Sequence, residues 1–163
     1  MRSVILFITA TFVAIQADLP AQNRQSLVGT WRLVSTSAST AAGRRIDAPI
    51  GSNPTGLITY TAEGRMMAII SSSGRKPLSG DHISASAAER AEAFATFFAY
   101  AGRYSLEGDK VIHHVEIASV ENWVNTDMVR MVTFENNRLI LRTPPLSVGG
   151  KLQTTDLVWE RVN

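Results

Sequence analysis

The second half of the chain is a succession of short strand-like segments separated by tight turns. Residues 103–106 and 110–118 are joined by Glu107-Gly108-Asp109, and residues 128–134 and 138–143 are joined by Glu135-Asn136-Asn137. Either asparagine tolerates the left-handed backbone that a turn of this kind requires. Because connections this short leave no room for a crossover helix, each pair of strands must run antiparallel.

The first half supplies further strands. Residues 27–34 form the first one, with Trp31, Leu33 and Ser35 expected on one face because side chains alternate along a strand. Residues 36–54 are rich in Ser, Ala, Gly and Pro, which indicates a long loop with a short strand near residues 45–46.

A hairpin comes next, with arms at residues 56–61 and 65–70 and with Gly64 free to take a positive φ in its loop. Together with a last segment at residues 153–162, the main strands number eight. Strands and helices do not alternate as they would in a parallel sheet. The pattern therefore predicts an all-β fold, either an antiparallel sandwich or a closed eight-stranded barrel, over residues 27–163.

One helix is predicted in the middle of the chain. Ser86 and Glu89 have the spacing of a capping box, and Gly102 is placed to end the helix. Small and aromatic residues recur between them at helical intervals: Ala87, Ala91, Phe94, Phe98 and Ala101. We expect this aromatic face to cover an apolar opening or edge of the barrel.

The N-terminus has the layout of a secretory signal peptide. Arg2 precedes an uncharged apolar run over residues 4–15, which is too short to span a bilayer, and a polar break follows. We expect a leader at residues 1–17, a linker at residues 18–26 and an exported protein, periplasmic or secreted. The alternatives are a membrane-tethering segment or a misassigned start. No later stretch is long and apolar enough to cross a membrane.

Composition excludes several classes of function. The formal net charge is +2 and the basic residues are dispersed, so nucleic-acid binding has no support. The chain contains no cysteine, which removes disulfides and thiolate metal sites. Its three histidines, His82, His113 and His114, cannot converge on zinc, because adjacent strand residues point to opposite faces. We expect neither a metal nor a cofactor, and the oligomeric state is left open.

Two motifs at the ends of the folded region resemble the calycin arrangement. Gly29-Thr30-Trp31 lies on the first strand and Arg161 on the last, and in calycins the late Arg packs across the first-strand Trp at the closed end of the barrel. A guanidinium over an indole face gains a cation–π contact while its donors bind nearby carbonyls.

The rest of the chain resembles the lipocalin-like domain family of bacteria and fungi, from about residue 27 to the end. The motifs that carry the resemblance are Gly56-Leu57-Ile58-Thr59-Tyr60, Gly64-Arg65-Met66, Tyr100-Ala101-Gly102-Arg103-Tyr104, His113-His114-Val115-Glu116, Asn122-Trp123-Val124, Arg138-Leu139, Thr143-Pro144-Pro145 and Leu157-Val158-Trp159-Glu160-Arg161. The chain departs from the family pattern at Glu121, where Pro is usual, and at Asn125, where Gly is frequent. The resemblance implies a barrel with a small-molecule cavity, but no particular substrate or reaction.

The strand at residues 111–118 carries the candidate chemistry. His114 and Glu116 share a face and could act as an acid–base pair, or Glu116 could simply orient a half-exposed His114 outside the barrel. His113 shares the opposite, more apolar face with Val111, Val115 and Ile117, which favours His113 as the inward histidine. In that position His113 could contact a ligand, or it could be a core residue whose ring nitrogens are hydrogen-bonded within the protein.

Further candidates lie on other segments. Trp123, in a loop, could stack on a ligand at the barrel mouth or cover the edge of the core. Arg130 would need a partner inside a barrel, either Glu116 or an anionic ligand, and would be solvated outside. The full set of predicted ligand-binding residues is Tyr60, Met67, Phe98, Tyr104, His113, His114, Glu116, Trp123 and Arg130.

Three functions fit this sequence. The favoured one is an exported lipocalin-like protein that binds a small, mostly hydrophobic molecule in a barrel cavity. The second is a cofactor-independent cyclase or isomerase in which His114, Glu116 and Arg130 steer protons and charge around a hydrophobic substrate. The third is a structural protein with a filled core, which contacts its partners through loops. Binding without catalysis is the preferred reading.

Overall fold

The computed structural model describes residues 26–47 and 49–162. The predicted leader at residues 1–17 lies outside the described residues, as does nearly all of the predicted linker. Within the described part of the chain, no helix has both the length and the apolar character needed to cross a membrane.

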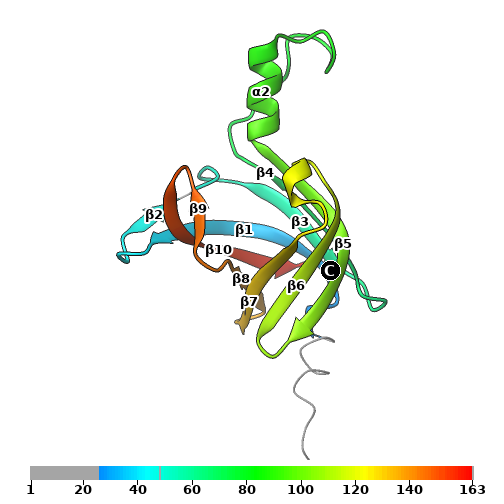
Figure 1. The fold of residues 1–163 in the computed structure, drawn as a ribbon, viewed down its shortest axis with the longest axis vertical. Coiled ribbons are helices and arrows are strands. Elements are labelled where there is room, and N and C mark those ends of the chain that lie inside the picture. Colours follow the sequence, from blue (N-terminus) through cyan, green and yellow to red (C-terminus); the bar gives the residue numbers. More distant parts are fainter. Residues whose placement is uncertain (1–25, 48, 163) are drawn as a thin grey trace, which may run out of the picture.

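Eight antiparallel strands form a closed barrel, which confirms the predicted fold (Figure 1). These strands are β1 (Gly29–Thr40), β3 (Thr55–Tyr60), β4 (Arg65–Ser71), β5 (Phe97–Glu107), β6 (Lys110–Ala118), β7 (Asp127–Glu135), β8 (Arg138–Arg142) and β10 (Lys151–Arg161). Each pairs with the next in this order, and β10 pairs with β1 to close the barrel. Two short strands extend the rim: β2 (Arg45–Asp47) lies beside β1, and β9 (Leu146–Val148) lies beside β10.

The turns have the predicted chemistry. Gly64 has a φ of 85° in the β3–β4 turn, and Asn136 and Asn137 have φ values of 49° and 63° in the β7–β8 turn. Asn125 also has a positive φ, of 60°, at the place where the family pattern often has Gly. Asparagine is among the residues best able to replace glycine in this conformation, so the substitution is compatible with a left-handed backbone here.

Two β-bulges change which residues face inward. In β1 the register with β10 shifts after Leu33, so that Thr36 is buried while Ser35 is exposed, although alternation predicted Ser35 beside Trp31 and Leu33. In β6 the register with β5 shifts at Glu116. The extra residue places Ile117 on the outer face, 67% exposed, although alternation predicted it on the face of His113.

One end of the barrel is sealed by the predicted tryptophan–arginine contact. The guanidinium of Arg161 lies 4.2 Å from the ring centroid of Trp31. Its two terminal nitrogens donate to the carbonyl oxygens of Val28 at 2.8 Å and Ser26 at 2.6 Å. The indole nitrogen of Trp31 donates in turn to the carbonyl of Leu27, a fully buried residue. This end is therefore filled by side chains.

The helix α2 (Ala87–Ala95) is shorter than predicted and does not cover the barrel. Its start is confirmed, because Ser86 and Glu89 form both hydrogen bonds of a capping box. It ends before Phe97, where β5 begins, so Gly102 lies inside that strand instead of ending the helix. None of the helix residues is buried, and α2 projects beyond the rim of the barrel (Figure 1).

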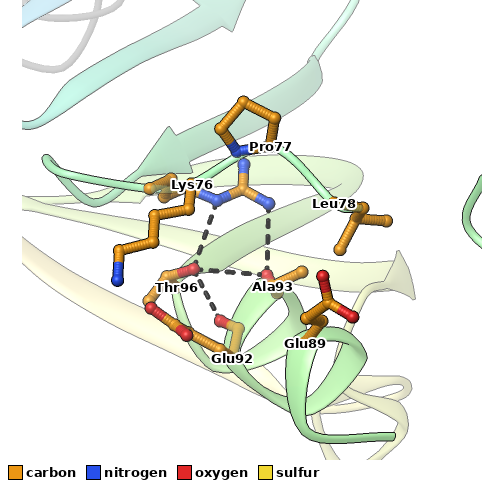
Figure 2. Close-up of a pocket in the computed structure, with 8 residues that line it drawn as sticks. Lys76, Pro77, Leu78, Glu89, Glu92, Ala93 and Thr96 are labelled. Atoms are coloured by element: carbon orange, nitrogen blue, oxygen red, sulfur yellow. Dashed lines mark hydrogen bonds between the residues drawn. The ribbon is translucent and has the colours of Figure 1, made fainter. Parts of the chain in front are cut away.

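Arg75 ties the end of α2 back to the barrel. Its guanidinium donates to the carbonyl oxygen of Ala93 and to the hydroxyl of Thr96, both at 3.2 Å, and it lies 5.2 Å from the ring centroid of Phe97. The positive charge of Arg75 also interacts favourably with the negative, C-terminal end of the helix dipole. The hollow beside these contacts is small, about 90 Å³, and its wall includes Glu89 and Glu92 (Figure 2). The small size of this hollow and the Arg75 contacts beside it indicate that this region holds the helix in place.

Candidate ligand-binding site

A histidine held between two tyrosines lies on the inner face of the barrel. His113 on β6 is fully buried, which confirms the inward orientation predicted for it. Its Nε2 atom is 2.7 Å from the hydroxyl of Tyr60 on β3, and its Nδ1 atom is 3.1 Å from the hydroxyl of Tyr100 on β5. Tyr104 packs edge-on against Tyr60 at 5.0 Å between ring centroids and donates to the carbonyl of Thr61.

Burial keeps the three titratable groups of this cluster neutral. Desolvation, with the nearby charges of Arg130 and His114, holds the pKa of His113 well below its usual value of 6.5. Burial also raises the pKa of Tyr60 well above 10.0. For Tyr100, burial raises the pKa, while the charge of Arg130 and its hydrogen bond to the Tyr100 hydroxyl oppose the rise. The cluster is therefore a set of neutral hydrogen-bonding groups at physiological pH.

The hydrogen-bond lengths assign directions within the cluster. A neutral imidazole has one donor nitrogen and one acceptor nitrogen. The 2.7 Å contact fits an O–H of Tyr60 donating to Nε2, and the 3.1 Å contact fits the N–H at Nδ1 donating to Tyr100. In this arrangement the Tyr100 hydroxyl accepts from His113 and can still donate its own proton to a third group.

Aromatic rings continue from the cluster toward the end of the barrel where β5 begins. Trp123, at the end of the short helix η1 (Glu121–Trp123), stacks on Phe98 with 6.1 Å between ring centroids and meets Tyr100 edge-on at 6.2 Å. Along β5, Phe98 and Tyr100 are half-buried while Tyr104 is only 4% exposed. Solvent access to the inner face therefore decreases from the rim toward the sealed end.

Arg130 is a charged residue that lies on the inner face. On β7 it pairs across the ladder with the buried Val111 and so points to the same side as His113. It is half-buried. One terminal nitrogen donates to the carbonyl of Val129 at 2.8 Å, and the other lies 3.7 Å from the sulfur of Met128.

Two further polar atoms inside the barrel have no hydrogen-bond partner among the described residues. They are the hydroxyl of Thr36 on β1 and the indole nitrogen of Trp159 on β10. Thr36 is 8% exposed and Trp159 is 1% exposed. Because an unsatisfied buried polar group is unfavourable, the β1–β10 wall offers hydrogen-bonding capacity to whatever enters the barrel.

The predicted pairing of His114 with Glu116 does not form. Both lie on the outer face, where Glu116 binds Arg65 at 2.6 Å and Arg103 at 3.1 Å. These two guanidinium groups hold the pKa of Glu116 below its usual value, with the hydrogen bond from Arg65 as the largest cause. The trio joins β4, β5 and β6 on the outside of the barrel.

His114 instead forms a second outer cluster. Its Nδ1 atom is 2.7 Å from Asp127 and its Nε2 atom is 2.9 Å from the hydroxyl of Ser105. The order of these residues is that of a hydrolytic triad, but such a triad also needs donors aimed at the developing oxyanion. The neighbouring guanidinium of Arg103 is already bound to Glu116. We read both outer clusters as structural.

The structure thus brings six of the nine predicted residues together on the inner side: Tyr60, Phe98, Tyr104, His113, Trp123 and Arg130. Met67, His114 and Glu116 lie outside, with Met67 54% exposed on the outer face of β4. Tyr100 was missed as a site residue because it was placed at the end of the helix. Phe98, Tyr100, Gly102 and Tyr104 also alternate as the residues of a strand do, but the first part of this segment fits a helical pattern equally well.

Apolar side chains also occur on the outer face. A shallow groove of about 370 Å³ runs over β1, β3 and β4, and its wall includes Arg32, Leu57 and Ile69. Leu57 and Ile69 are cross-strand partners, 48% and 43% exposed.

Comparison with known proteins identifies the family. Residues 28–162 match the model of the lipocalin-like domain. The chain belongs to the lipocalin-like domain family. Over 83 residues, which are 45% of this chain and 75% of the relative, it is 32% identical to the 4'-hydroxy-3'-methoxypropiophenone carrier protein of Aspergillus oryzae.

Two solved structures show a similarity to this chain. One is a lipocalin-like protein of Bacteroides uniformis, with a TM-score of 0.41 and 14% identity, covering 84% of this chain and 99% of that one. The other is a protein of Bacteroides eggerthii, with a TM-score of 0.40 and 13% identity, covering 83% of this chain and 99% of that one.

Proposed function

We propose that this lipocalin-like barrel binds a small, mostly apolar aromatic molecule on its inner face. The observation that carries the proposal is the set of half-buried rings next to neutral hydrogen-bonding groups. Phe98, Tyr100 and Trp123 offer apolar ring surface near the rim, and the Tyr60–His113–Tyr100 cluster lies deeper. A mostly apolar wall with a few fixed polar groups is the usual composition of a small-molecule site.

The Aspergillus oryzae relative supports this choice of ligand class. It is named as a carrier of 4'-hydroxy-3'-methoxypropiophenone, which is a benzene ring with hydroxyl, methoxy and ketone oxygens. A ring with oxygen substituents matches aromatic side chains that stand beside tyrosine and histidine. We therefore expect this chain to carry an oxygen-substituted aromatic compound.

The arrangement of these residues favours ligand binding without catalysis over a cyclase or isomerase reaction. Cyclase or isomerase catalysis by His114, Glu116 and Arg130 would need all three at one cavity, and only Arg130 faces inward. The inner histidine is neutral and already bonded at both ring nitrogens. These features favour a carrier over an enzyme.

A direct test is titration of the purified protein with N-phenyl-1-naphthylamine, a neutral aromatic probe whose fluorescence rises in apolar sites. We expect saturable binding that 4'-hydroxy-3'-methoxypropiophenone displaces. Replacement of Trp123 by Ala should weaken probe binding about tenfold, because it removes a ring that stacks at the rim. Absence of saturable binding by the wild type would contradict the proposal.

Met67→Ala is the matched control for this titration. Met67 is an apolar side chain of the same barrel, but it lies on the outer face and is 54% exposed. We expect its replacement to leave probe affinity unchanged. An equal loss of affinity in the Met67 and Trp123 variants would place the bound probe outside the barrel.

We also propose that the carrier is exported, on the basis of the basic residue and short apolar run at the N-terminus. Expression of the full chain in a Gram-negative host, followed by fractionation and N-terminal sequencing, tests this proposal. We expect the protein in the periplasm with Asp18 as its first residue. Full-length protein in the cytoplasm would contradict export without affecting the binding proposal.

A further inference from the structure

Arg130 places a positive charge on the inner face without a negative partner. The ion pairs formed by the described residues join Arg32, Arg65, Arg103, His114 and Arg142 to carboxylates, and none of them includes Arg130. The carboxylate that the sequence offered as its partner, Glu116, lies on the opposite side of β6 and is bound by two other arginines. Among the described residues, the inner face thus carries this cation without a carboxylate to pair with it.

The contacts that Arg130 does make are weak ones for a guanidinium. A guanidinium carries five N–H donors in a planar fork. Here one terminal nitrogen binds the carbonyl of Val129, the other approaches the thioether of Met128, which is a poor acceptor, and a further hydrogen bond joins the guanidinium to the hydroxyl oxygen of Tyr100. These contacts involve no carboxylate and do not use all five donors, so Arg130 can bind a further acceptor.

The neighbours of Arg130 complete an anion-binding arrangement. Its charge acts on Tyr60, Tyr100 and His113, which places all four groups around one region of the inner face. The hydroxyl proton of Tyr100 is free in the hydrogen-bond pattern that the cluster lengths favour. A guanidinium and a hydroxyl donor can together bind the two oxygens of one carboxylate.

We propose that the ligand of this barrel is an aromatic acid whose ionised carboxylate binds Arg130 and Tyr100. Its ring packs against Phe98 and Trp123, which stack on each other at the rim. This assignment rests on the proposed binding function and adds a charge to the ligand. A carboxylate would gain charge-assisted hydrogen bonds in a partly desolvated site, whereas a neutral amide of the same shape would not.

Naphthalene-2-carboxylate and naphthalene-2-carboxamide test the assignment, because they differ in charge and hardly in shape. We expect the wild type to bind the acid at least about tenfold more tightly than the amide at neutral pH. Arg130→Gln should bring the two affinities to within about twofold of each other, mainly by weakening the acid. Tyr100→Phe, which keeps the ring, should weaken binding of the acid more than binding of the amide.

Arg138→Gln is the matched control, because it removes the same charge from an exposed position on β8. It should keep the full preference for the acid. Arg130→Lys should keep a reduced preference, since it retains charge without the planar fork. Circular dichroism and thermal unfolding of each variant verify its fold, and the loss of an unpaired inward cation should not lower the melting temperature.

The outcomes separate the two proposals. Equal affinities of the wild type for acid and amide, or an unchanged preference for the acid in Arg130→Gln, would overturn the aromatic-acid assignment and leave the binding function in place. Binding of the neutral probe but of neither naphthalene compound would also overturn it. Failure of all three compounds to bind the wild type would overturn both proposals.

Discussion

Gly102 is the residue that allows β5 to pass the bulge in β6. A β-carbon at this position would lie 2.0 Å from the carbonyl oxygen of His114 and 3.0 Å from the amide nitrogen of Glu116. Both are backbone atoms of a paired strand, so they cannot move aside as a flexible side chain could. Gly102 is therefore required by close approach of two backbones, although the sequence suggested a helix terminus.

Replacement of Gly102 by Ala should accordingly destabilise the barrel by at least about 2 kcal/mol. Urea unfolding at equilibrium measures this loss. Gly108→Ala is the control, because Gly108 has a φ of +59° and an added β-carbon there would meet nothing within 4 Å. That variant should lose only about 1 kcal/mol, the cost of a left-handed backbone. Equal losses in the two variants would contradict the close-contact explanation.

His113 makes the stability of the protein depend on pH. Its pKa is depressed in the folded state, first by desolvation and then by the charge of Arg130, whereas the unfolded chain has a histidine near 6.5. Below that pH the unfolded state binds a proton that the folded state does not bind. Stability is therefore fully present above pH 6.5 and falls as the pH drops toward the folded pKa.

We expect the free energy of unfolding to fall by up to about 1.4 kcal/mol per pH unit in this range because of His113 alone. Urea titrations at pH values from 5 to 8 measure the slope. His113→Gln should have a flatter profile, although it will be less stable at pH 8 because the tyrosine hydroxyls lose a partner. His114→Gln, on the outer face, is the control. If His113 causes the dependence of the unfolding free energy on pH, this variant should have the same slope as the wild type.

At the scale of elements, the strands could be predicted from alternation and turn chemistry, but the bulges and the helix end could not. The shifts at Val34 and Glu116 depend on how two strands pair, which a single segment does not encode. The residues 94–101 satisfy both a helical and an alternating pattern, and pairing with β4 and β6 decided for a strand from Phe97 onward. Inward residues on either side of these points, such as His113, Tyr104 and Arg130, were therefore predictable, while Tyr100, Thr36 and Ile117 were not.

The projecting helix α2 should unfold independently of the barrel, because none of its residues is buried. Its start depends on the reciprocal hydrogen bonds between Ser86 and Glu89. Ser86→Ala should cost the helix about 1 kcal/mol and speed hydrogen exchange of the amides after the cap, without a change in the urea midpoint of the barrel. Exchange of the β5 and β6 amides in the same sample is the internal control. A lowered midpoint would mean that α2 supports the barrel.

At the scale of the whole molecule, the two ends of the barrel differ in kind. The end near Trp31 is filled, and the guanidinium of Arg161 closes it by binding two carbonyls of the segment that precedes β1. At the other end, the half-buried rings of Phe98 and Trp123 leave the inner face in contact with solvent. For the proposed ligand, this asymmetry favours entry at the end that carries Phe98 and Trp123.

The sealed end should then contribute to stability but not to binding. Arg161→Lys keeps a charge near Trp31 but loses the planar fork whose two nitrogens bind Val28 and Ser26, so we expect a loss of about 1–2 kcal/mol in urea unfolding. Arg32→Lys is the matched change in the same pair of strands, where Arg32 makes only an exposed ion pair with Glu160. It should cost less than about 0.5 kcal/mol. Because both positions are remote from the rim, neither variant should change the affinity for N-phenyl-1-naphthylamine. A weaker affinity in Arg161→Lys would mean that the closed end also shapes the ligand site.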